Sequence, residues 1–208
     1  MRFLITAGGT REYIDPVRFI SNASSGRMGY ALARAALRRG CEVVLVAAPT
    51  GLKAPCGAEL VSVESAQEMF RAVKAYFDEC DCLIMAAAVA DYRPTQRAAR
   101  KLKKGRGVLT LRLKPTDDIL KWAGMHKRPG QVLVGFALED RSVLQAARRK
   151  LVEKRLDMIV ANTPTAVAQE RSSVDILTAD GQHLVIEDQS KQLTARRIIR
   201  MACERAGP

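Results

Sequence analysis

Residues 26–48 read GRMGYALARAALRRGCEVVLVAA, and this stretch decides the fold. Its first part has helical character and ends at Gly40, which is a typical helix stop. The second part, 41–48, is β-branched and continuously apolar, as expected of a strand that is buried on both faces. A helix that passes directly into a buried strand is typical of α/β proteins with a largely parallel sheet.

The same alternation continues on both sides of this stretch. Ser65 and Glu68 form a predicted capping box, and Asp180-Gly181 predicts the turn of a hairpin over 172–188. Further strands are predicted at 2–6, 59–64, 82–90, 107–115, 131–137 and 158–162, and further helices at 65–79, 142–156, 189–206 and in a short segment capped by Thr116. We therefore expect one domain over residues 1–208. The expected fold is an α/β, three-layer, Rossmann-like sandwich with a mostly parallel mixed sheet and a late β-hairpin. Ligands of such sheets bind beyond the carboxyl ends of the strands, in the loops after residues 6, 48, 87, 115, 137 and 162.

Composition restricts the function without deciding it. The 208 residues carry a net charge of +12, which suits nucleic acid but equally phosphorylated small molecules. We expect a cytoplasmic protein, because no signal peptide and no membrane-spanning apolar stretch is visible. Five cysteines without a framework spacing are interpreted as free thiols, and two histidines are too few for a His-based metal cage.

The loop before the first helix does not match the standard nucleotide motifs. Its closest frame to G-x-G-x-x-G is SSGRMG (24–29), in which a serine replaces the first glycine, and no acid ends the second strand. No G-K-[ST] follows either, so a Walker loop is also excluded. An anion site remains, because the N-terminus of a helix attracts negative charge. Ser24, Ser25 and Gly26 would form it, although either serine could instead be an ordinary helix cap.

Two polar segments converge on this helix tip. Gly8, Gly9 and Thr10 leave the end of the first strand, and Arg18 and Asn22 precede the serines. The alternative for Asn22 is a loop residue that bonds its own backbone. Convergence of two loops on one terminus favours a binding site.

The stretch ITAGGTREYIDPVRFISNASSGRMGYALA closely resembles the start of the phosphopantothenate–cysteine ligases. Four further blocks resemble the same family in the same order: AAAVADYRP (86–94), KLKK (101–104), GFALE (135–139) and KLVEKRLDMIVAN (150–162). In many bacteria this ligase is fused behind a flavin-dependent decarboxylase. The resemblance implies a free-standing synthetase, for which no flavin is expected.

The resemblance also implies a reaction and its residues. The family joins 4′-phosphopantothenate to cysteine in coenzyme A biosynthesis through an acyl-cytidylate, with CTP and Mg²⁺ in bacteria and ATP in some eukaryotic relatives. Asn22 and Arg18 match catalytic positions of the family. The positions that match nucleotide contacts are Met85, Ala86, Ala87, Asp91, Lys101, Asp117, Asp118, Ile119, Leu120, Phe136, Lys150 and Lys154. The ligands of the metal are not identified. The family is typically a homodimer whose site is completed at the subunit interface, and the 172–188 hairpin is a candidate exchange arm.

The chain departs from the family pattern at two places. Arg27 stands where many relatives have Lys, and AQERSSVD (168–175) replaces a segment that typically contains Asp and Asn. From the residues alone, a solvated helix face is favoured over a ligand site for Lys150 and Lys154. Two rival functions remain, a nicotinamide-dependent reductase and a nucleic-acid binder that uses 93–107. Tyr92 is the only aromatic residue near that basic run, so stacking platforms are scarce. We expect neither a nucleic acid nor a membrane as partner.

Overall fold

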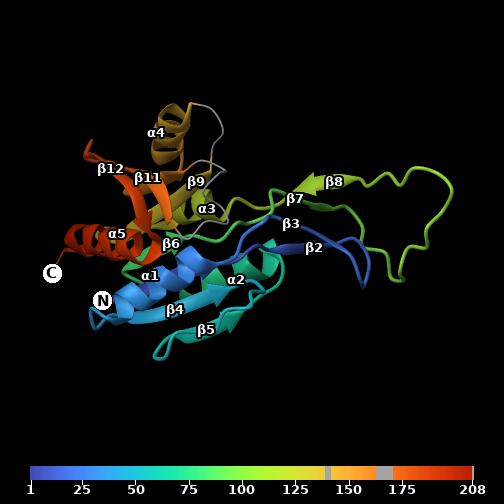
Figure 1. The fold of residues 1–208 in the computed structure, drawn as a ribbon, viewed down its shortest axis with the longest axis horizontal. Helices are drawn as coiled ribbons and strands as arrows, with labels where there is room; N and C mark the ends of the chain where they lie inside the picture. The colour runs from blue at the N-terminus through green and yellow to red at the C-terminus, as the bar shows by residue number, and fades with distance from the viewer. Residues whose placement is uncertain (139–141, 163–170, 208) are drawn as a thin grey trace.

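The computed structural model describes residues 1–138, 142–162 and 171–207. Within these residues, eight strands form one mixed sheet in the order β12-β11-β10-β9-β6-β1-β4-β5 (Figure 1). The parallel strands are β1 (Arg2–Ala7), β4 (Glu42–Ala47), β5 (Glu59–Ser62), β6 (Cys82–Met85), β9 (Val132–Leu138) and β10 (Met158–Asn162). The predicted hairpin is confirmed as β11 (Arg171–Thr178) and β12 (His183–Ser190), which extend the sheet antiparallel to β10. The hairpin is thus part of the main sheet and has β12 at the sheet edge.

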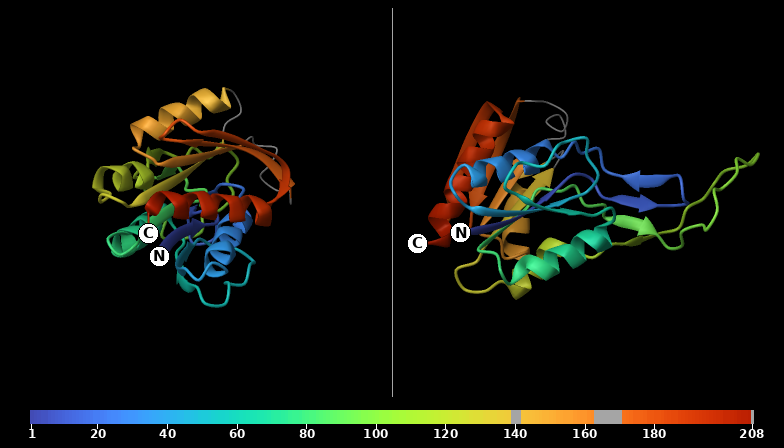
Figure 2. Two further views of the ribbon diagram at one scale, coloured as in Figure 1. Left: turned by 90° about the vertical axis from the view of Figure 1, so that its left-hand side faces the viewer. Right: turned by 90° about the horizontal axis from the view of Figure 1, so that it is seen from below.

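Helices cover both faces of the sheet. α1 (Arg27–Leu37) and α5 (Lys191–Ala206) lie side by side on one face (Figure 2). α2 (Ala66–Phe77), α3 (Ile119–His126) and α4 (Val143–Glu153) pack on the other. A hydrophobic core lies on each face of the sheet, and alternate β1 residues belong to one or the other. Phe3 and Ile5 pack toward α1, while Leu4 packs toward α2. The predicted three-layer α/β sandwich is confirmed.

The centre of the sheet is a topological switch point. From β1 the chain adds β4 and β5 on one side, and it then crosses to β6, β9 and β10 on the other. Gly29 lets α1 approach β1 closely, because a Cβ at this position would lie 2.5 Å from the Ala7 Cβ. The start of α1 is thereby fixed above the carboxyl end of β1, where ligands of open α/β sheets bind.

An extended arm, residues 92–115, projects from this end of the sheet (Figures 1 and 2). It begins with β7 (Tyr92–Pro94) and returns through β8 (Leu113–Pro115), which pairs antiparallel with β7. The predicted strand over 107–115 is therefore wrong for 107–112. Within the described part of the chain that segment pairs with no strand, and its alternating apolar side chains are exposed, as shown by Val108 at 96%.

A second short hairpin supports the arm. β2 (Arg11–Tyr13) and β3 (Phe19–Ser21) pair within a stretch expected to be only a polar loop. The Ala98 N–H donates to the Ile14 carbonyl oxygen at 2.9 Å, and Arg97 lies over the Tyr13 ring at 4.8 Å. Three-residue strands are too short to produce a recognisable sequence period.

Two predicted boundaries differ for identifiable reasons. The strand expected over 82–90 ends at Met85, because the N–H groups of Ala87, Ala88 and Ala90 bond to the end of β1 and to the loop after it. Ala87 donates to Thr6 Oγ1 at 3.1 Å, Ala88 to Gly8 O at 2.8 Å and Ala90 to Thr10 Oγ1 at 2.9 Å. Helix α3 is capped by Asp118, which accepts from the Lys121 N–H, and not by Thr116, whose hydroxyl donates to Ala90 O at 2.6 Å. The capping box of Ser65 and Glu68 is confirmed.

Candidate functional site

The main cavity, of about 980 Å³, lies at the carboxyl ends of β6, β9 and β10, beside the start of α1. It gathers most of the predicted site residues from segments far apart in the chain. Those that line it are Asn22, Ser24, Ser25, Gly26, Met85, Ala86, Ala87, Asp91, Asp117, Asp118, Ile119, Leu120, Phe136, Lys150 and Lys154. Gly8, Gly9, Thr10, Arg18 and Lys101 are not among the lining residues. Parts of the loops after 137 and 162, including residues 168–170 of the atypical segment, lie outside the described residues.

The N-terminus of α1 opens toward this cavity without a side-chain cap. Gly26 is the N-cap residue and has φ +72°, a left-handed conformation that favours glycine. A Cβ at this position would also lie 2.7 Å from Thr50 Cγ2. The alternative that Ser24 or Ser25 caps the helix is therefore wrong. Ser24 Oγ instead accepts from the Gly26 N–H at 3.4 Å.

Asn22 connects two loops at the edge of the cavity through hydrogen bonds. Its side-chain amide donates to the carbonyl oxygens of Val89, at 3.0 Å, and Ala88, at 3.4 Å. The amide therefore bridges the segment before α1 and the segment after β6. The alternative in which Asn22 bonds its own loop backbone does not describe this structure, since both partners lie more than sixty positions along the chain.

Gly8, Gly9 and Thr10 form a buried scaffold beneath the cavity. Gly8 has φ +83°, and a Cβ on Gly9 would lie 2.6 Å from the Asn22 carbonyl oxygen. Thr10 is fully buried, and its hydroxyl accepts from the Ala90 N–H. These three residues hold the Asn22 and Ala90 segments in contact, so their effect on a ligand would be indirect.

Arg18 and Lys101 belong to the arm and its supporting hairpin. The Arg18 guanidinium pairs with the buried Asp15 carboxylate at 2.5 Å and donates to Leu102 O. The Leu102 N–H in turn donates to Asp15 at 3.1 Å. Burial raises the pKa of Asp15, but the hydrogen bonds from Arg18, Val17 and Leu102 outweigh it and hold the pKa well below the ordinary value. Lys101, next to this contact, is exposed on the arm.

An ion pair lines the cavity where the start of α3 meets the end of α4. Lys154 Nζ lies 2.8 Å from an Asp118 carboxylate oxygen. Burial raises the pKa of Asp118, but its hydrogen bonds with Lys154 and the Lys121 N–H have the larger combined effect and lower it. Gly124 makes this approach feasible, because a Cβ there would lie 1.9 Å from the Lys154 carbonyl oxygen.

The cavity also contains residues that the motifs did not identify. Tyr92, Asn162 and Lys191 line it, and so does Arg27, which the sequence marked only as a departure from the family. Lys191 is the first residue of α5, next to the cap Ser190. The capping serine could have predicted where α5 begins. No sequence pattern near Lys191 predicts that the β11–β12 hairpin places the start of α5 beside the cavity.

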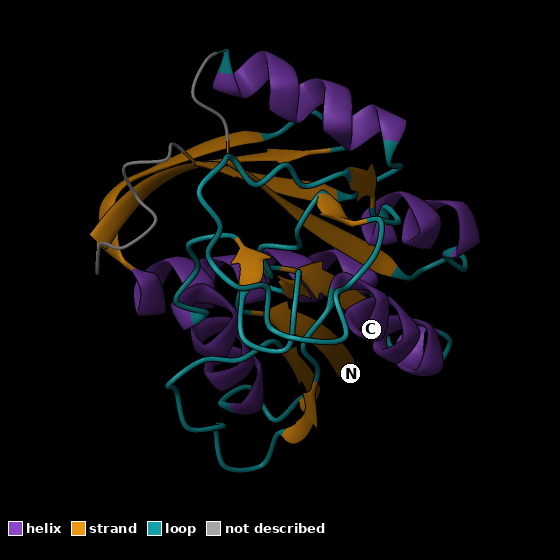
Figure 3. Ribbon diagram, turned by 90° about the vertical axis from the view of Figure 1, so that its right-hand side faces the viewer, coloured by secondary structure: helices purple, strands orange, loops and turns teal. Residues whose placement is uncertain are grey.

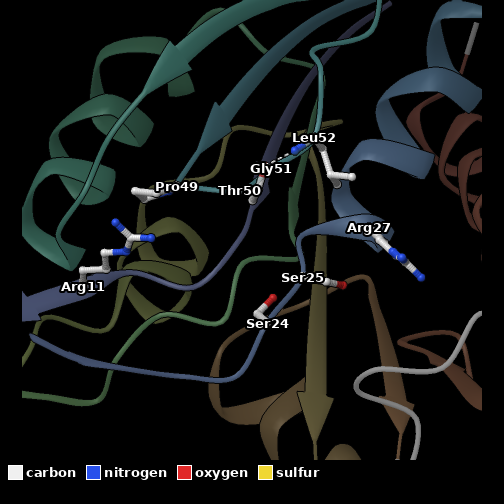
Figure 4. Close-up of a pocket in the computed structure, with 8 residues that line it drawn as sticks. All are labelled: Arg11, Ser24, Ser25, Arg27, Pro49, Thr50, Gly51 and Leu52. Carbon is white, nitrogen blue, oxygen red and sulfur yellow. Dashed lines mark hydrogen bonds between the residues drawn. The ribbon is translucent and has the colours of Figure 1, made fainter.

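A smaller hollow of about 610 Å³ shares Ser24, Ser25 and Arg27 with the main cavity. Its remaining lining comes from Arg11 and the loop 49–52 after β4. Figure 4 shows Arg11 and Arg27 on opposite sides of this hollow. The Thr50 hydroxyl fixes the loop by accepting from the Leu52 N–H at 3.2 Å.

A metal-binding cluster and a membrane-spanning helix are both absent from the described residues. Among residues 1–138, 142–162 and 171–207, no cluster of three or more His, Cys, Asp or Glu side chains could hold a metal ion. No helix in the described part of the chain has the length and apolar character needed to cross a bilayer. Figure 3 shows the loops of the cavity end with the helices of both faces around them.

Comparisons with known proteins identify relatives of the whole fold. Residues 1–205 match the family described as DNA/pantothenate metabolism flavoprotein C-terminal domain. The coenzyme A biosynthesis bifunctional protein CoaBC of Mycobacterium tuberculosis is 45% identical over 215 residues, covering 95% of this chain and 51% of that protein. The protein of the same name from Bacillus subtilis is 51% identical over 160 residues, covering 76% of this chain and 39% of that protein. The chain thus spans about half the length, or less, of these two relatives.

Solved structures agree with this family. The crystal structure of the C-terminal domain of a CoaBC protein superposes with a TM-score of 0.84 at 43% identity, covering 96% of this chain and 92% of that domain. A Cab2 variant in complex with phosphopantothenate-cysteine has a TM-score of 0.78 at 17% identity, covering 99% and 86%, and shares the fold. The chain therefore belongs to the family of the C-terminal domain of the DNA/pantothenate metabolism flavoproteins.

Proposed function

We propose that this domain is a phosphopantothenate–cysteine ligase that acts in the cytoplasm in coenzyme A biosynthesis. The observation that carries the proposal is the main cavity at the switch point of the sheet, which gathers fifteen of the predicted site residues, twelve of them implied by the resemblance. Those residues come from separate blocks of the sequence, so a chance match of one loop would not bring them together. The CoaBC relatives, which are named as coenzyme A biosynthesis proteins, support the same activity.

The proposed reaction has two steps. The carboxylate of 4′-phosphopantothenate attacks the α-phosphate of CTP, which releases pyrophosphate and leaves an acyl-cytidylate. The cysteine amine then attacks the acyl carbon, forms the amide and releases CMP. Both steps develop negative charge on oxygen, and placed hydrogen-bond donors stabilise such charge. The donors proposed for this role are the uncapped N–H groups at the start of α1 and the Asn22 amide, which would exchange its bonds to the Val89 and Ala88 carbonyl oxygens for the developing oxyanion.

The nucleotide is proposed to lie against Phe136 and the segment after β6. The N–H groups of Ala87 and Ala88 are already bonded within the protein. Recognition of a base amino group would therefore fall to carbonyl oxygens of this segment. Magnesium usually keeps several waters and takes one or two protein carboxylates with substrate phosphates. Asp91 and Asp117, which line the cavity, suit that role and would hold the ion that neutralises the triphosphate.

We further propose that the site is completed in a homodimer. Lys101 matches a residue that reaches the triphosphate, yet it lies on the projecting arm and does not line the cavity of its own chain. The arm exposes Val108, Leu109, Leu111 and Leu113, and a patch of this kind favours association. A second copy that covers the arm would receive Lys101 at its own cavity.

Pyrophosphate release tests the proposed reaction. The protein is incubated with Mg²⁺, 4′-phosphopantothenate and either CTP or ATP, with and without cysteine. We expect release that requires both phosphopantothenate and a nucleotide, and CTP is expected to be the better substrate. Amide formation, followed by mass spectrometry, should require cysteine in addition. Absence of release with every nucleotide would overturn the ligase assignment.

A further inference from the structure

Thr6 is a fully buried polar residue near the carboxyl end of β1. A buried hydroxyl destabilises a protein unless it is hydrogen-bonded, so its partners show why it is tolerated. The Thr6 oxygen accepts from the Ala87 N–H at 3.1 Å, and the hydroxyl donates to the Met85 sulfur at 3.6 Å. Both partners belong to residues 85–87, here called the wall segment, which lines the main cavity.

The sheet fixes the position of Thr6 itself. Thr6 pairs with Val46 of β4 on one side and with Met85 of β6 on the other. Its side chain points to the same face of the sheet as that of Leu4, because alternate residues of a strand share a face. Thr6 is not among the residues that line the cavity. Its effect on a ligand would therefore act through the wall segment.

The wall segment turns away from the regular strand directly after Met85. The Ala86 N–H donates to the Ile84 carbonyl oxygen at 3.2 Å, which closes a three-residue turn. Outside the strand ladders, no hydrogen bond between described residues ends on the carbonyl oxygen of Ala86 or Ala87. These two oxygens are therefore acceptors that a ligand could use.

The bond from Ala87 to Thr6 sets the direction of one of these acceptors. The Ala86 carbonyl and the Ala87 N–H belong to the same peptide group, which is planar and trans, so they point in opposite directions. Because the N–H points at the buried Thr6 hydroxyl, the Ala86 carbonyl oxygen points away from it. Ala86 lines the cavity. Thr6 thus controls how this peptide is presented to a ligand.

We propose that Thr6 is a positioning residue for recognition of the nucleobase. The inference rests on the proposed ligase function and adds to it the residue that sets the preference among nucleotides. By holding the Ala87 N–H, Thr6 aligns the Ala86 carbonyl oxygen with an exocyclic amino group of the base. Cytosine carries such an amino group, whereas uracil carries at the same place a carbonyl oxygen, which cannot donate. Loss of the Thr6 hydroxyl should therefore reduce the preference for CTP over UTP.

The test compares Thr6→Val with Thr178→Val. Valine keeps the branched shape of threonine but removes the hydroxyl, which leaves the Ala87 N–H without this acceptor. Thr178 is also buried, and its hydroxyl accepts from the Gln182 N–H at 3.1 Å, but it lies at the β11–β12 turn and does not line the cavity. Calorimetry measures the affinity of each variant for CTP and for UTP, both with Mg²⁺. We expect Thr6→Val to lower the ratio of the two affinities by about five-fold or more, as misalignment of one hydrogen bond would. Thr178→Val should keep the wild-type ratio.

Thr6→Ser separates positioning from packing. It retains the hydroxyl and should retain the wild-type ratio, even where loss of the methyl group lowers the melting temperature. An unchanged ratio in Thr6→Val would overturn the positioning role, and so would a wild type that binds CTP no better than UTP. A ratio lowered equally in Thr6→Ser or in Thr178→Val would also overturn it, because packing or general stability would then be the cause.

The result is separable from that of the ligase assignment. If the wild type releases pyrophosphate but Thr6→Val keeps the wild-type ratio, the positioning role is wrong and the ligase assignment stands. If the wild type releases no pyrophosphate but its preference for CTP is lost in Thr6→Val and kept in Thr6→Ser, the ligase assignment fails and the positioning role stands.

Discussion

Gly29 is the residue on which the position of the α1 terminus depends. A Cβ there would meet the Ala7 Cβ at 2.5 Å and the Thr6 carbonyl oxygen at 2.8 Å. Alanine is intrinsically better in a helix by up to about 1 kcal/mol, so an open site would be stabilised by the exchange. At Gly29 we expect the opposite sign, a loss of about 1–3 kcal/mol from overpacking. Urea unfolding measures it, and Gly105→Ala, with open space around it, is the control.

Replacement of Asn22 is expected to lower the rate of the chemical step without changing the affinity for the nucleotide. Asn22→Ala removes the amide that donates to Val89 and Ala88, and with it a donor on the cavity wall. We expect kcat to fall by about 100-fold or more, the cost of one oxyanion donor, while the affinity for CTP changes little. Steady-state kinetics and calorimetry check the two quantities. An equal collapse of CTP affinity would show that Asn22 acts by binding the nucleotide.

Residue types alone could not distinguish a cavity wall from its support. Thr10 and Asn22 look alike in the sequence as polar loop residues, yet the structure buries Thr10 and places Asn22 on the cavity. The family resemblance located most wall residues because they lie in ordered blocks. Lys191 was missed, since its place depends on pairing between β10, β11 and β12 rather than on any local pattern.

Asp15 is the carboxylate that links the arm to the β2–β3 hairpin, because it accepts from Arg18 and from the Leu102 N–H. Because its folded pKa lies below the ordinary carboxyl value, it stabilises the native state fully above that value, near pH 4. That contribution is lost as the pH falls further, through the folded pKa. We therefore expect Asp15→Asn to be less stable than the wild type at pH 7, with a difference that shrinks below about pH 4. Denaturant unfolding at both pH values measures this.

Trypsin provides an independent readout of the same contact. Asp15→Asn releases Leu102 and Arg18, so the lysines of 101–104 should be cleaved faster at pH 8 than in the wild type. Asp78→Asn, at the exposed end of α2, is the matched control. Equal cleavage rates in all three proteins would show that other contacts hold the arm.

Long elements were predictable and short ones were not. Caps and continuous apolar runs located α2, β4 and β10 to within a few residues. β2, β3, β7 and β8 have three residues each, and their pairing partners are set by the turns and by long-range contacts. The segment 107–112 has the alternation of a strand without a neighbour to pair with, which periodicity cannot reveal.

At the scale of the molecule, the exposed apolar arm predicts the assembly. Leu109 and Leu111 are 57% and 38% exposed. We expect light scattering to show a dimer for the wild type and a monomer for the double variant Leu109→Asp, Leu111→Asp, because charge at an apolar interface is strongly disfavoured. Val152→Asp, which replaces an exposed apolar residue on α4, should remain dimeric.

Mixing inactive variants tests whether the site is shared. The Lys101→Ala variant lacks the lysine but keeps Asn22, and the Asn22→Ala variant lacks the amide but keeps Lys101. If Lys101 serves the partner's cavity, a mixed dimer contains one site with both residues intact, and activity should rise on mixing. No recovery, with exchange of subunits demonstrated, would place both residues in one chain's site.

The strand order has a consequence for how the chain folds. β1 is central, and its partners lie far along the chain, since Arg2 pairs with Glu42 and Phe3 with Cys82. Until β6 joins, β1 is an apolar edge, and such edges invite wrong pairing with other chains. Closing non-local pairs is also slow, because chain entropy is lost before contacts compensate for it. Fragments that stop before Cys82 are therefore expected to aggregate, and acquisition of β6 is the step that commits the chain to its native sheet.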